Sequence, residues 1–297
     1  VKVNLTNIQP LHENKEICFL GMMKAGPFDI TENQALDFLA DFGNPNQCSN
    51  TDVVKPNMAG RDVTNRWNRG WIIDFGEMTE QQAALYEKPF EYVRRVVKPI
   101  REENRRERTK RRWWLFGETR PGLREKLSHL QRCIVTPEVS KYRLFIWITT
   151  STIPDHKLHV FVRDDDYFFG ILHSKLHEIW SLKIGSTLED RPSYSSSRTF
   201  ETFPFPWPPG KEPQGDPRVQ AIAQAARELV QLRDNWLNPP GASEADLKAD
   251  VERLMKQWER IEKKAASASA KKSGSGGAPA LLHGEPDLTI RVIRDVF

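Results

Sequence analysis

The segment from Asp164 to Glu178 holds the side chains of this 297-residue chain that are best suited to metal binding or acid–base chemistry. It combines three aspartates, two histidines and one glutamate within fifteen residues. His173 and His177 lie four residues apart, so on a helix both imidazoles would share one face, as two zinc ligands can. Consecutive aspartates could instead hold Mg²⁺ for phosphoryl transfer.

The spacing of these residues argues against both chemistries. The order is H-x-x-x-H-E rather than H-E-x-x-H, no third ligand is apparent, and His173 is expected to precede the helix. Asp164 to Asp166 would point in different directions, and no E-x-K sequence follows at a useful distance. We therefore predict a turn with a helix or arginine cap for the aspartates and core or polar-contact roles for the histidines. No metal-binding or catalytic residue is expected in the chain.

The elements that would position these residues are predicted from hydrophobic patterning. Leu158 to Arg163 alternates as a half-buried strand does, and Tyr167 to Leu172 is a second apolar run. The aspartates between them predict a hairpin of strand, turn and strand. Ser174 to Leu182 (SKLHEIWSL) is expected to form the helix that follows. The region is thus predicted to be a mixed sheet with polar residues at its edge.

Local signals predict the other elements of an α+β fold. Extended segments are expected at Ile17–Met22, Thr51–Val54, Trp71–Phe75, Cys133–Val135 and Tyr142–Thr150. Capping boxes predict helices after Thr31 and Thr79, and Pro121 suits the first position of another. Two amphipathic stretches, Val219–Leu237 and Glu244–Lys264, predict a C-terminal helical hairpin.

The composition is that of a globular protein with room for one large or two smaller domains. Its 44 Lys and Arg against 40 Asp and Glu give a net charge of +4, too small by itself to indicate nucleic-acid binding. Three isolated cysteines without a CxxC pair argue against a zinc ribbon or a disulfide framework and suit a reducing cytoplasm. No apolar run approaches eighteen residues, so membrane insertion is not expected. We divide the chain into residues 1–206, the main domain; 207–264, a linker and the helical hairpin; and 265–297, a flexible segment and tail.

Charge is unevenly distributed, with a basic stretch from Arg94 to Arg132. This stretch contains 14 Lys or Arg and 5 acidic residues, an excess that would attract a polyphosphate backbone. The alternative is a solvated helix face with ion pairs four residues apart, such as Glu102–Arg106. Both interpretations stay open.

Several motifs, in the same order along the chain, carry a resemblance to a known family. They are Ile17–Ile30 (ICFLGMMKAGPFDI), Trp71–Gly76 (WIIDFG), Ala84–Val93 (ALYEKPFEYV), Phe161–Arg163 (FVR), Asp164–Gly170 (DDDYFFG), His173–Trp180 (HSKLHEIW) and Thr199–Pro206 (TFETFPFP). From Ile17 to Pro240 the chain resembles the target recognition domain of MmeI-like restriction–modification enzymes, which are adenine-specific DNA methyltransferases often fused to a nuclease. Gly60 to Arg66 is similar to the G-x-D-[IV]-T-x-R segment of that family.

The resemblance implies that this chain, which begins with Val1 rather than Met, is the recognition part of a longer enzyme. A preceding N-terminal methyltransferase domain would bind S-adenosylmethionine and transfer its methyl group to adenine N6, so no cofactor-binding residue is expected here. This chain would bind double-stranded DNA, gripping its phosphates and reading its base edges. The residues expected to contact DNA are Arg61, Arg66, Arg105, Lys141, Arg143, Arg163, His173, Ser174 and Lys175.

Asn238-Pro239-Pro240-Gly241 invites comparison with the Asn-Pro-Pro-aromatic loop in which amino-methyltransferases hold a flipped base. The fourth residue is glycine, so the stacking ring is missing, and no glycine-rich cofactor loop between a strand and a helix precedes it. We interpret the tetrapeptide as a helix stop. Two other functions remain open: a stand-alone nucleic-acid-binding protein that uses the basic stretch, and a scaffold that assembles through its helical hairpin.

Overall fold

The computed structural model describes residues 8–64, 70–188 and 191–237. The chain divides into two compact units, Val1–Gln224 and Ala225–Phe297, each of which is described by itself. The first unit contains almost all of the described elements. The predicted second helix of the C-terminal hairpin and the predicted flexible tail lie outside the described residues.

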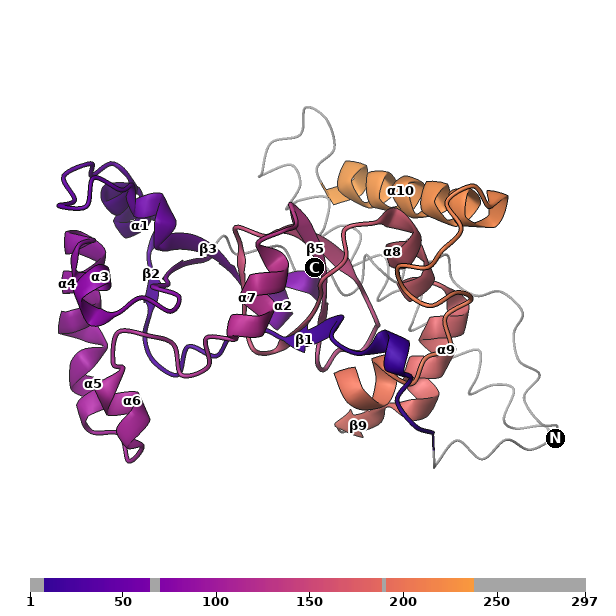
Figure 1. The fold of residues 1–297 in the computed structure, drawn as a ribbon, viewed down its shortest axis with the longest axis horizontal. Coiled ribbons are helices and arrows are strands. Elements are labelled where there is room, and N and C mark those ends of the chain that lie inside the picture. Colours follow the sequence, from indigo (N-terminus) through magenta and orange to yellow (C-terminus); the bar gives the residue numbers. More distant parts are fainter. Residues whose placement is uncertain (1–7, 65–69, 189–190, 238–297) are drawn as a thin grey trace, which may run out of the picture. The chain divides into compact units, whose positions relative to one another are not determined.

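Two four-stranded sheets form the framework of the first unit (Figure 1). The first sheet is antiparallel and has the order β1 (Cys18–Leu20), β8 (Leu158–Phe161), β5 (Arg132–Pro137) and β6 (Ile146–Thr149). The second has the order β2 (Asp29–Ile30), β4 (Gly70–Ile73), β3 (Val54–Met58) and β7 (Ile153–Pro154). In it β3 pairs with β7 in parallel, whereas the other neighbours are antiparallel. Strands β9 (Ser186–Leu188) and β10 (Arg191–Ser193) pair separately. The predicted α+β fold with a mixed sheet is therefore confirmed.

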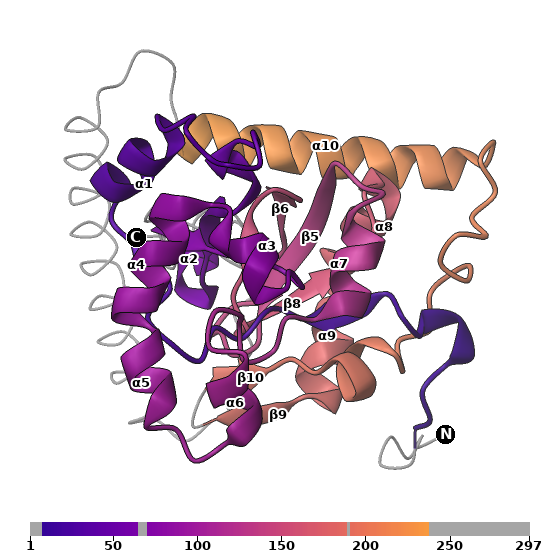
Figure 2. The same cartoon turned by 60° about the vertical axis from the view of Figure 1, so that its left-hand side comes forward.

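Short helices accompany the sheets. They are α1 (Glu32–Leu39), α2 (Gly60–Thr64), α3 (Glu80–Ala84), α4 (Glu87–Val96), α5 (Lys98–Glu102), α6 (Glu107–Arg111) and α7 (Pro121–Leu127), with 3₁₀ turns η2 (His12–Asn14) and η3 (Asn50–Asp52). Helix α1 contacts β3 and β4, and α3 to α6 follow one another as contacting helices (Figure 2). Both predicted capping boxes are present: Thr31 and Gln34 exchange hydrogen bonds at the start of α1, and Thr79 and Gln82 do so at the start of α3.

A single buried cluster draws on both sheets. It includes Ile72 from β4, Val135 from β5 and Val160 from β8, each fully buried. Trp113 and Leu115 enter the same cluster from the segment between α6 and α7. Burial of this apolar surface is the main force that stabilises the unit, and it places the middle of the basic stretch against the core.

The predicted hairpin around the three aspartates is half wrong, because Tyr167–Leu172 forms a helix rather than a second strand. Helix α8 (Asp166–Leu172) begins at Asp165, whose carboxylate accepts the Phe168 N–H at 2.8 Å. Five of its seven residues are buried. A helix buried on most sides lacks the polar face that distinguishes it from a strand in sequence.

The last motif, Thr199–Pro206, packs the chain back onto α8. The rings of Phe168 and Phe205 stack with centroids 5.2 Å apart, and Phe200 and Phe203 each meet Phe205 edge-on. These phenylalanines therefore hold the motif against α8 by ring packing. Helix α9 (Lys175–Ile184), the π-helical turn η4 (Ser196–Phe200) and α10 (Pro217–Leu237) complete the described elements. No helix in the described part of the chain is long and apolar enough to cross a membrane.

Candidate nucleic-acid interface

The densest group of exposed arginines lies in residues 102–112, which we call the arginine loop. It runs from the end of α5 through a bend to the end of α6. Arg105, Arg106, Arg108 and Arg111 are all exposed, and none of their side chains makes a hydrogen bond or ion pair with another described residue. Four guanidinium groups without acidic partners form a surface that suits a polyanion.

The alternative of a solvated helix face is met only in part, since the ion pairs that form are spaced three residues apart, as in Arg94–Glu91 at 2.6 Å, rather than four. A new helix begins at Lys98 with Pro99 in its first turn, so the stretch is divided into α4, α5 and α6 rather than forming one long helix. Glu102 therefore ends α5 while Arg106 precedes α6, and the predicted pair between them is not formed. Glu107 pairs instead with Lys110, at 3.4 Å.

The C-terminal end of the arginine loop is attached to the core. Arg112 Nη2 lies 3.0 Å from Glu77 Oε2, and the indole N–H of Trp114 donates to the carbonyl of Met78 at 2.9 Å. The ammonium group of Lys98 lies 5.1 Å from the centre of the Trp113 ring. The loop is thus held in place although its arginines point into solvent.

Arg61 is exposed on α2, although the polar sequence of residues 60–66 is typical of a loop. The helix forms because Asp62, buried within it, accepts a hydrogen bond from the Ala59 N–H at 2.8 Å. The Arg61 side chain makes no hydrogen bond, ion pair or ring contact with another described residue. Arg66 lies outside the described residues.

Arg143 is largely enclosed and serves three acceptors. Its guanidinium donates to the carbonyl of Pro137, to Thr136 Oγ1 at 3.1 Å and to the carbonyl of Pro192 at 3.2 Å. It also lies 4.9 Å from the centre of the Tyr194 ring. Burial lowers the pKa of Arg143 to about 10. Contact with a base would require these bonds to break.

Lys141 differs from Arg143 although only two residues separate them. Its side chain is exposed, with the ammonium nitrogen 5.5 Å from the centre of the Tyr142 ring. Neither residue belongs to a strand, because β6 begins at Ile146, four residues later than predicted.

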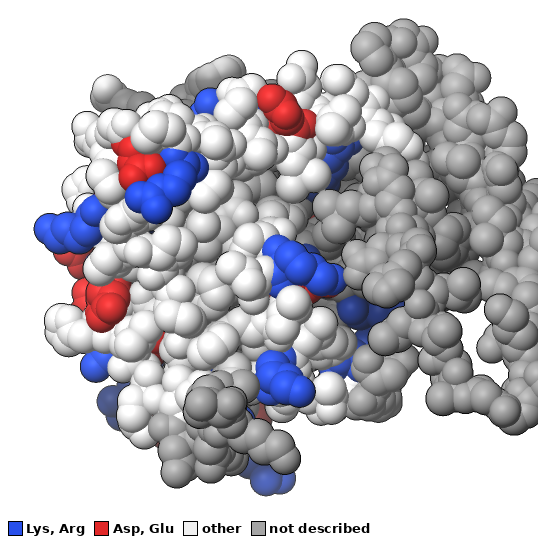
Figure 3. All heavy atoms as spheres, turned by 90° about the vertical axis from the view of Figure 1, so that its right-hand side faces the viewer, with Lys and Arg blue, Asp and Glu red and all other residues white. Residues whose placement is uncertain are grey.

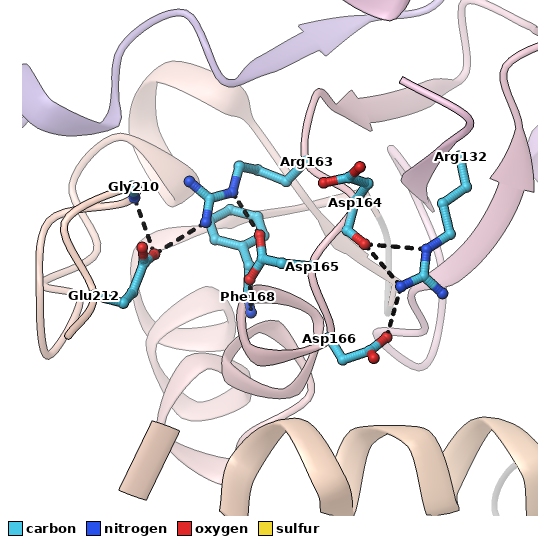
Figure 4. A network of polar contacts seen from close by, with 8 residues as sticks. All are labelled: Arg132, Arg163, Asp164, Asp165, Asp166, Phe168, Gly210 and Glu212. Atoms are coloured by element: carbon cyan, nitrogen blue, oxygen red, sulfur yellow. Dashed lines mark hydrogen bonds and ion pairs between the residues drawn. The ribbon is translucent and has the colours of Figure 1, made fainter. Parts of the chain in front are cut away.

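Arg163 neutralises two carboxylates (Figure 4). Its Nε lies 2.7 Å from Asp165 Oδ2 and its Nη2 lies 3.1 Å from Glu212 Oε1. The guanidinium carbon is 5.2 Å from the centre of the Phe168 ring. Arg163 therefore ties the start of α8 to the segment after the phenylalanine motif, and its hydrogen-bonding capacity is used mainly inside the protein.

Arg132, which the sequence analysis did not single out, holds the other half of the acidic turn (Figure 4). It donates to the Asp164 carbonyl at 2.7 Å and to Asp166 Oδ1 at 2.8 Å. Its guanidinium lies 3.8 Å from the centre of the Trp147 ring, on the neighbouring strand. The predicted helix or arginine cap is confirmed, since one aspartate caps α8 and two arginines bind the turn. The sequence signal that could have indicated this role of Arg132 is a basic residue placed diagonally opposite a tryptophan on a paired strand.

The side chains of His173 and His177 are both held by hydrogen bonds within the protein. His177 is fully buried: its Nδ1 donates to the Leu172 carbonyl at 2.9 Å, so its Nε2 accepts from the Tyr194 hydroxyl at 3.1 Å. Burial lowers the pKa of His177 to about 3. His173 ends α8, ahead of α9 as predicted, with its Nε2 2.9 Å from the Phe145 carbonyl. No group of three or more potential metal ligands occurs among the residues that were described.

Ser174 and Lys175 form the first turn of α9. Ser174 is the N-cap and accepts the His177 N–H at 3.2 Å, while Lys175 is exposed and pairs with Glu178 at 3.0 Å. Of the predicted contact residues that are described, Arg61, Arg105 and Lys141 combine exposure with the absence of an acidic partner. On the face shown in Figure 3, basic side chains occur as separate groups between neutral residues rather than as one continuous patch.

The α+β fold and the ordered motifs define the class, and comparison with known proteins places the chain within it. Residues 12–207, about two thirds of the chain, match the family model described as MmeI, target recognition domain. The chain therefore belongs to the MmeI target recognition domain family.

A solved structure shares the fold. It is that of the Type IIL restriction–modification enzyme MmeI in complex with DNA, which matches with a TM-score of 0.56 and 17% sequence identity. The match covers 99% of this chain but 35% of that chain. The present chain thus spans about a third of the length of the MmeI structure.

Proposed function

We propose that this chain is the DNA-recognition part of a site-specific DNA methyltransferase in a restriction–modification system. The observation that carries the proposal is membership of the MmeI target recognition domain family over residues 12–207. The related solved structure is a complex with DNA, which supports DNA as the partner, and we propose that the duplex is the form bound.

The arginine loop would supply sequence-independent affinity. Exposed guanidinium groups suit phosphate oxygens because they are permanently charged and can donate two parallel hydrogen bonds. Neutralising phosphates releases condensed counterions, so binding weakens steeply with salt. Arg61 and Lys141 are further candidates for contact, because both are exposed and have no acidic partner among the described residues.

The methyl transfer itself would take place outside this chain. In our proposal an N-terminal methyltransferase domain of the longer protein binds S-adenosylmethionine and methylates adenine N6, and the recognition domain presents the target site to it. Support comes from the length comparison, since the matched structure is about three times longer than its matching part. Extrusion of the target base from the duplex is the general solution for such chemistry.

Titration of a fluorescent duplex with the 297-residue chain tests the DNA-binding proposal. We expect log K to fall linearly with log salt and the affinity to drop by at least about tenfold between ~50 and ~200 mM salt. Affinity that does not change over this range, or no binding at low salt, would refute it. A matched single-stranded oligonucleotide is the control, and it should bind more weakly than the duplex.

Catalysis requires the longer protein. Incubated with duplex DNA and labelled S-adenosylmethionine, it is expected to label N6 of adenine at one sequence, whereas this chain alone is expected to transfer nothing. Label on cytosine, or label acquired with this chain alone, would contradict the assignment.

A further inference from the structure

Arg101 is the most deeply buried charged residue of the described chain, with 1% of its surface exposed. It lies on α5, directly before the arginine loop, and no acidic side chain of the described residues pairs with it. Burial lowers its pKa. An unpaired buried charge is unfavourable unless its hydrogen-bonding groups are satisfied. The Nε of Arg101 has no hydrogen-bond partner among the described residues, so the bonds of its Nη2 carry the burial of this charge.

Those contacts join three separate segments. Nη2 of Arg101 donates to the carbonyl of Leu115 at 3.0 Å and to the carbonyl of Lys24 at 2.8 Å. The Lys24 carbonyl also accepts the Gly117 N–H at 3.1 Å. The guanidinium carbon lies 5.5 Å from the centre of the Phe28 ring. One side chain thus links α5, the connection between β1 and β2, and the segment that follows α6.

The bond to Leu115 closes the arginine loop at its base. Residues 102–112 leave the core at Arg101 and return to it before Leu115, so a single guanidinium joins the departing chain to the returning chain. The four exposed arginines lie between these two points, and no side-chain hydrogen bond or ion pair to a described residue holds them. Their position therefore depends on how the base of the loop is fixed.

The guanidinium of Arg101 is closely surrounded on the side of Gly26. A Cβ atom built at Gly26 would lie 3.2 Å from Arg101 Nε, closer than an ordinary contact. The same Cβ would lie 3.2 Å from Phe28 Cε2 and 3.3 Å from Val97 Cγ1, so a methyl group at position 26 would press on the guanidinium and on the two side chains that pack beside it. Replacing Gly26 changes no charge and removes no hydrogen-bonding group, which makes it an independent way to disturb the same contact.

We propose that Arg101 is a positioning residue for DNA binding, which holds the arginine loop so that its exposed arginines reach the phosphates together. The inference rests on the proposed DNA-binding function. Arg101 itself is buried and contacts no ligand. Loss of its bonds would leave Arg105, Arg106, Arg108 and Arg111 in the chain but no longer fixed as a set.

The test compares salt dependence in Arg101→Met with that in the variant whose four exposed loop arginines are all alanine. Each lost phosphate contact lowers the slope of log K against log salt by about 0.9. We expect Arg101→Met to lose at least half of the slope that the fourfold variant loses, and to bind about tenfold or more weakly at ~100 mM salt. Gly26→Ala should show the same change in smaller measure and serves if Arg101→Met does not fold.

Hydrogen exchange of the unliganded protein supplies a readout that is independent of DNA. Amides of residues 102–112 should exchange faster in Arg101→Met and Gly26→Ala, whereas those of β5 should not change. An unchanged slope together with unchanged exchange in the loop would overturn the proposal. If the unmodified chain binds no duplex while the loop amides still respond, the DNA-binding function fails and the anchoring role of Arg101 stands.

Discussion

The arginines of the arginine loop and those that bind the acidic turn, Asp164 to Asp166, have opposite surroundings. In the loop, Arg105 and its neighbours are exposed and have no described partner. Around the turn, Arg132 and Arg163 bind aspartates, and at the opposite end of β5 Arg143 donates to three acceptors. An arginine whose donors are satisfied internally stabilises the fold, whereas one without partners retains its capacity for a ligand.

This difference separates two measurable quantities. Substitutions around the acidic turn should change the free energy of unfolding and leave DNA affinity, measured on the folded fraction, nearly unchanged. Substitutions in the arginine loop should do the reverse. A substitution that changed the free energy of unfolding and the DNA affinity equally would contradict this separation of the two groups of arginines.

The largest effect on stability is expected for Arg143→Ala. Its removal leaves three acceptors without their donor and removes the contact with Tyr194, and we expect the free energy of unfolding to fall by about 4 kcal/mol. Urea unfolding followed by circular dichroism measures this loss. Lys141→Ala is the matched control, because that side chain is exposed and should change stability by less than about 0.5 kcal/mol. If Arg143→Ala were as stable as the control and altered the preferred DNA sequence, Arg143 would instead be a base-reading residue.

Acid should lower the free energy of unfolding, by somewhat less than Arg143→Ala does, because two buried histidines must become protonated. Burial lowers the pKa of His177 to about 3 and that of His159 to about 4. Between these values and the pKa of about 6.5 in the unfolded chain, the unfolded state binds more protons, so stability is full above pH 6.5 and falls as the pH decreases. For two histidines the loss from pH 6.5 to pH 5 is about 3 kcal/mol.

Urea unfolding at several pH values measures this dependence. His177→Gln should reduce the pH dependence by about half, whatever its effect on stability at neutral pH. His129→Gln, at an exposed position, should retain the full dependence. A dependence that survives in His177→Gln would show that other groups are responsible.

The smallest effect on stability is expected for Arg105→Ala, which should change the free energy of unfolding by less than about 0.5 kcal/mol. Its effect on binding should be clear: weaker affinity for all sequences alike, with a salt slope reduced by about 0.9. Arg94→Ala is the comparison, since Arg94 already pairs with Glu91 at 2.6 Å and should contribute less to binding. Equal losses for the two variants would mean that an internal partner does not reduce phosphate contact.

Elements specified by nearby residues could be predicted from the sequence. The capping boxes at Thr31 and Thr79 and the proline at the start of α7 involve residues within one helical turn, and all three were predicted. Helix α8 was missed because tertiary burial, rather than local pattern, decides the state of an apolar run. The same holds for Gly60–Thr64, whose helix forms around the buried Asp62.

The roles of individual arginines could not be predicted in the same way. Arg163 meets Glu212 and Arg143 meets Pro192, in each case 49 residues further along the chain. No local signal distinguishes these residues from Arg105, and an abundance of positive charge describes both groups. Family motifs identified the domain, but partners brought together by the fold determine which cations remain available.

The pairing of β1 with β8 has a consequence for how the chain folds during synthesis. Cys18 lies opposite Phe161, so more than a hundred further residues must be synthesised before β1 can pair with β8. Because β8 lies between β1 and β5 and pairs with both, the first sheet cannot be completed until β8 has left the ribosome. Contacts of such long sequence separation slow folding, and an unpaired strand edge invites association with other chains. Truncations that end before residue 158 should therefore be recovered as aggregates rather than as folded domains.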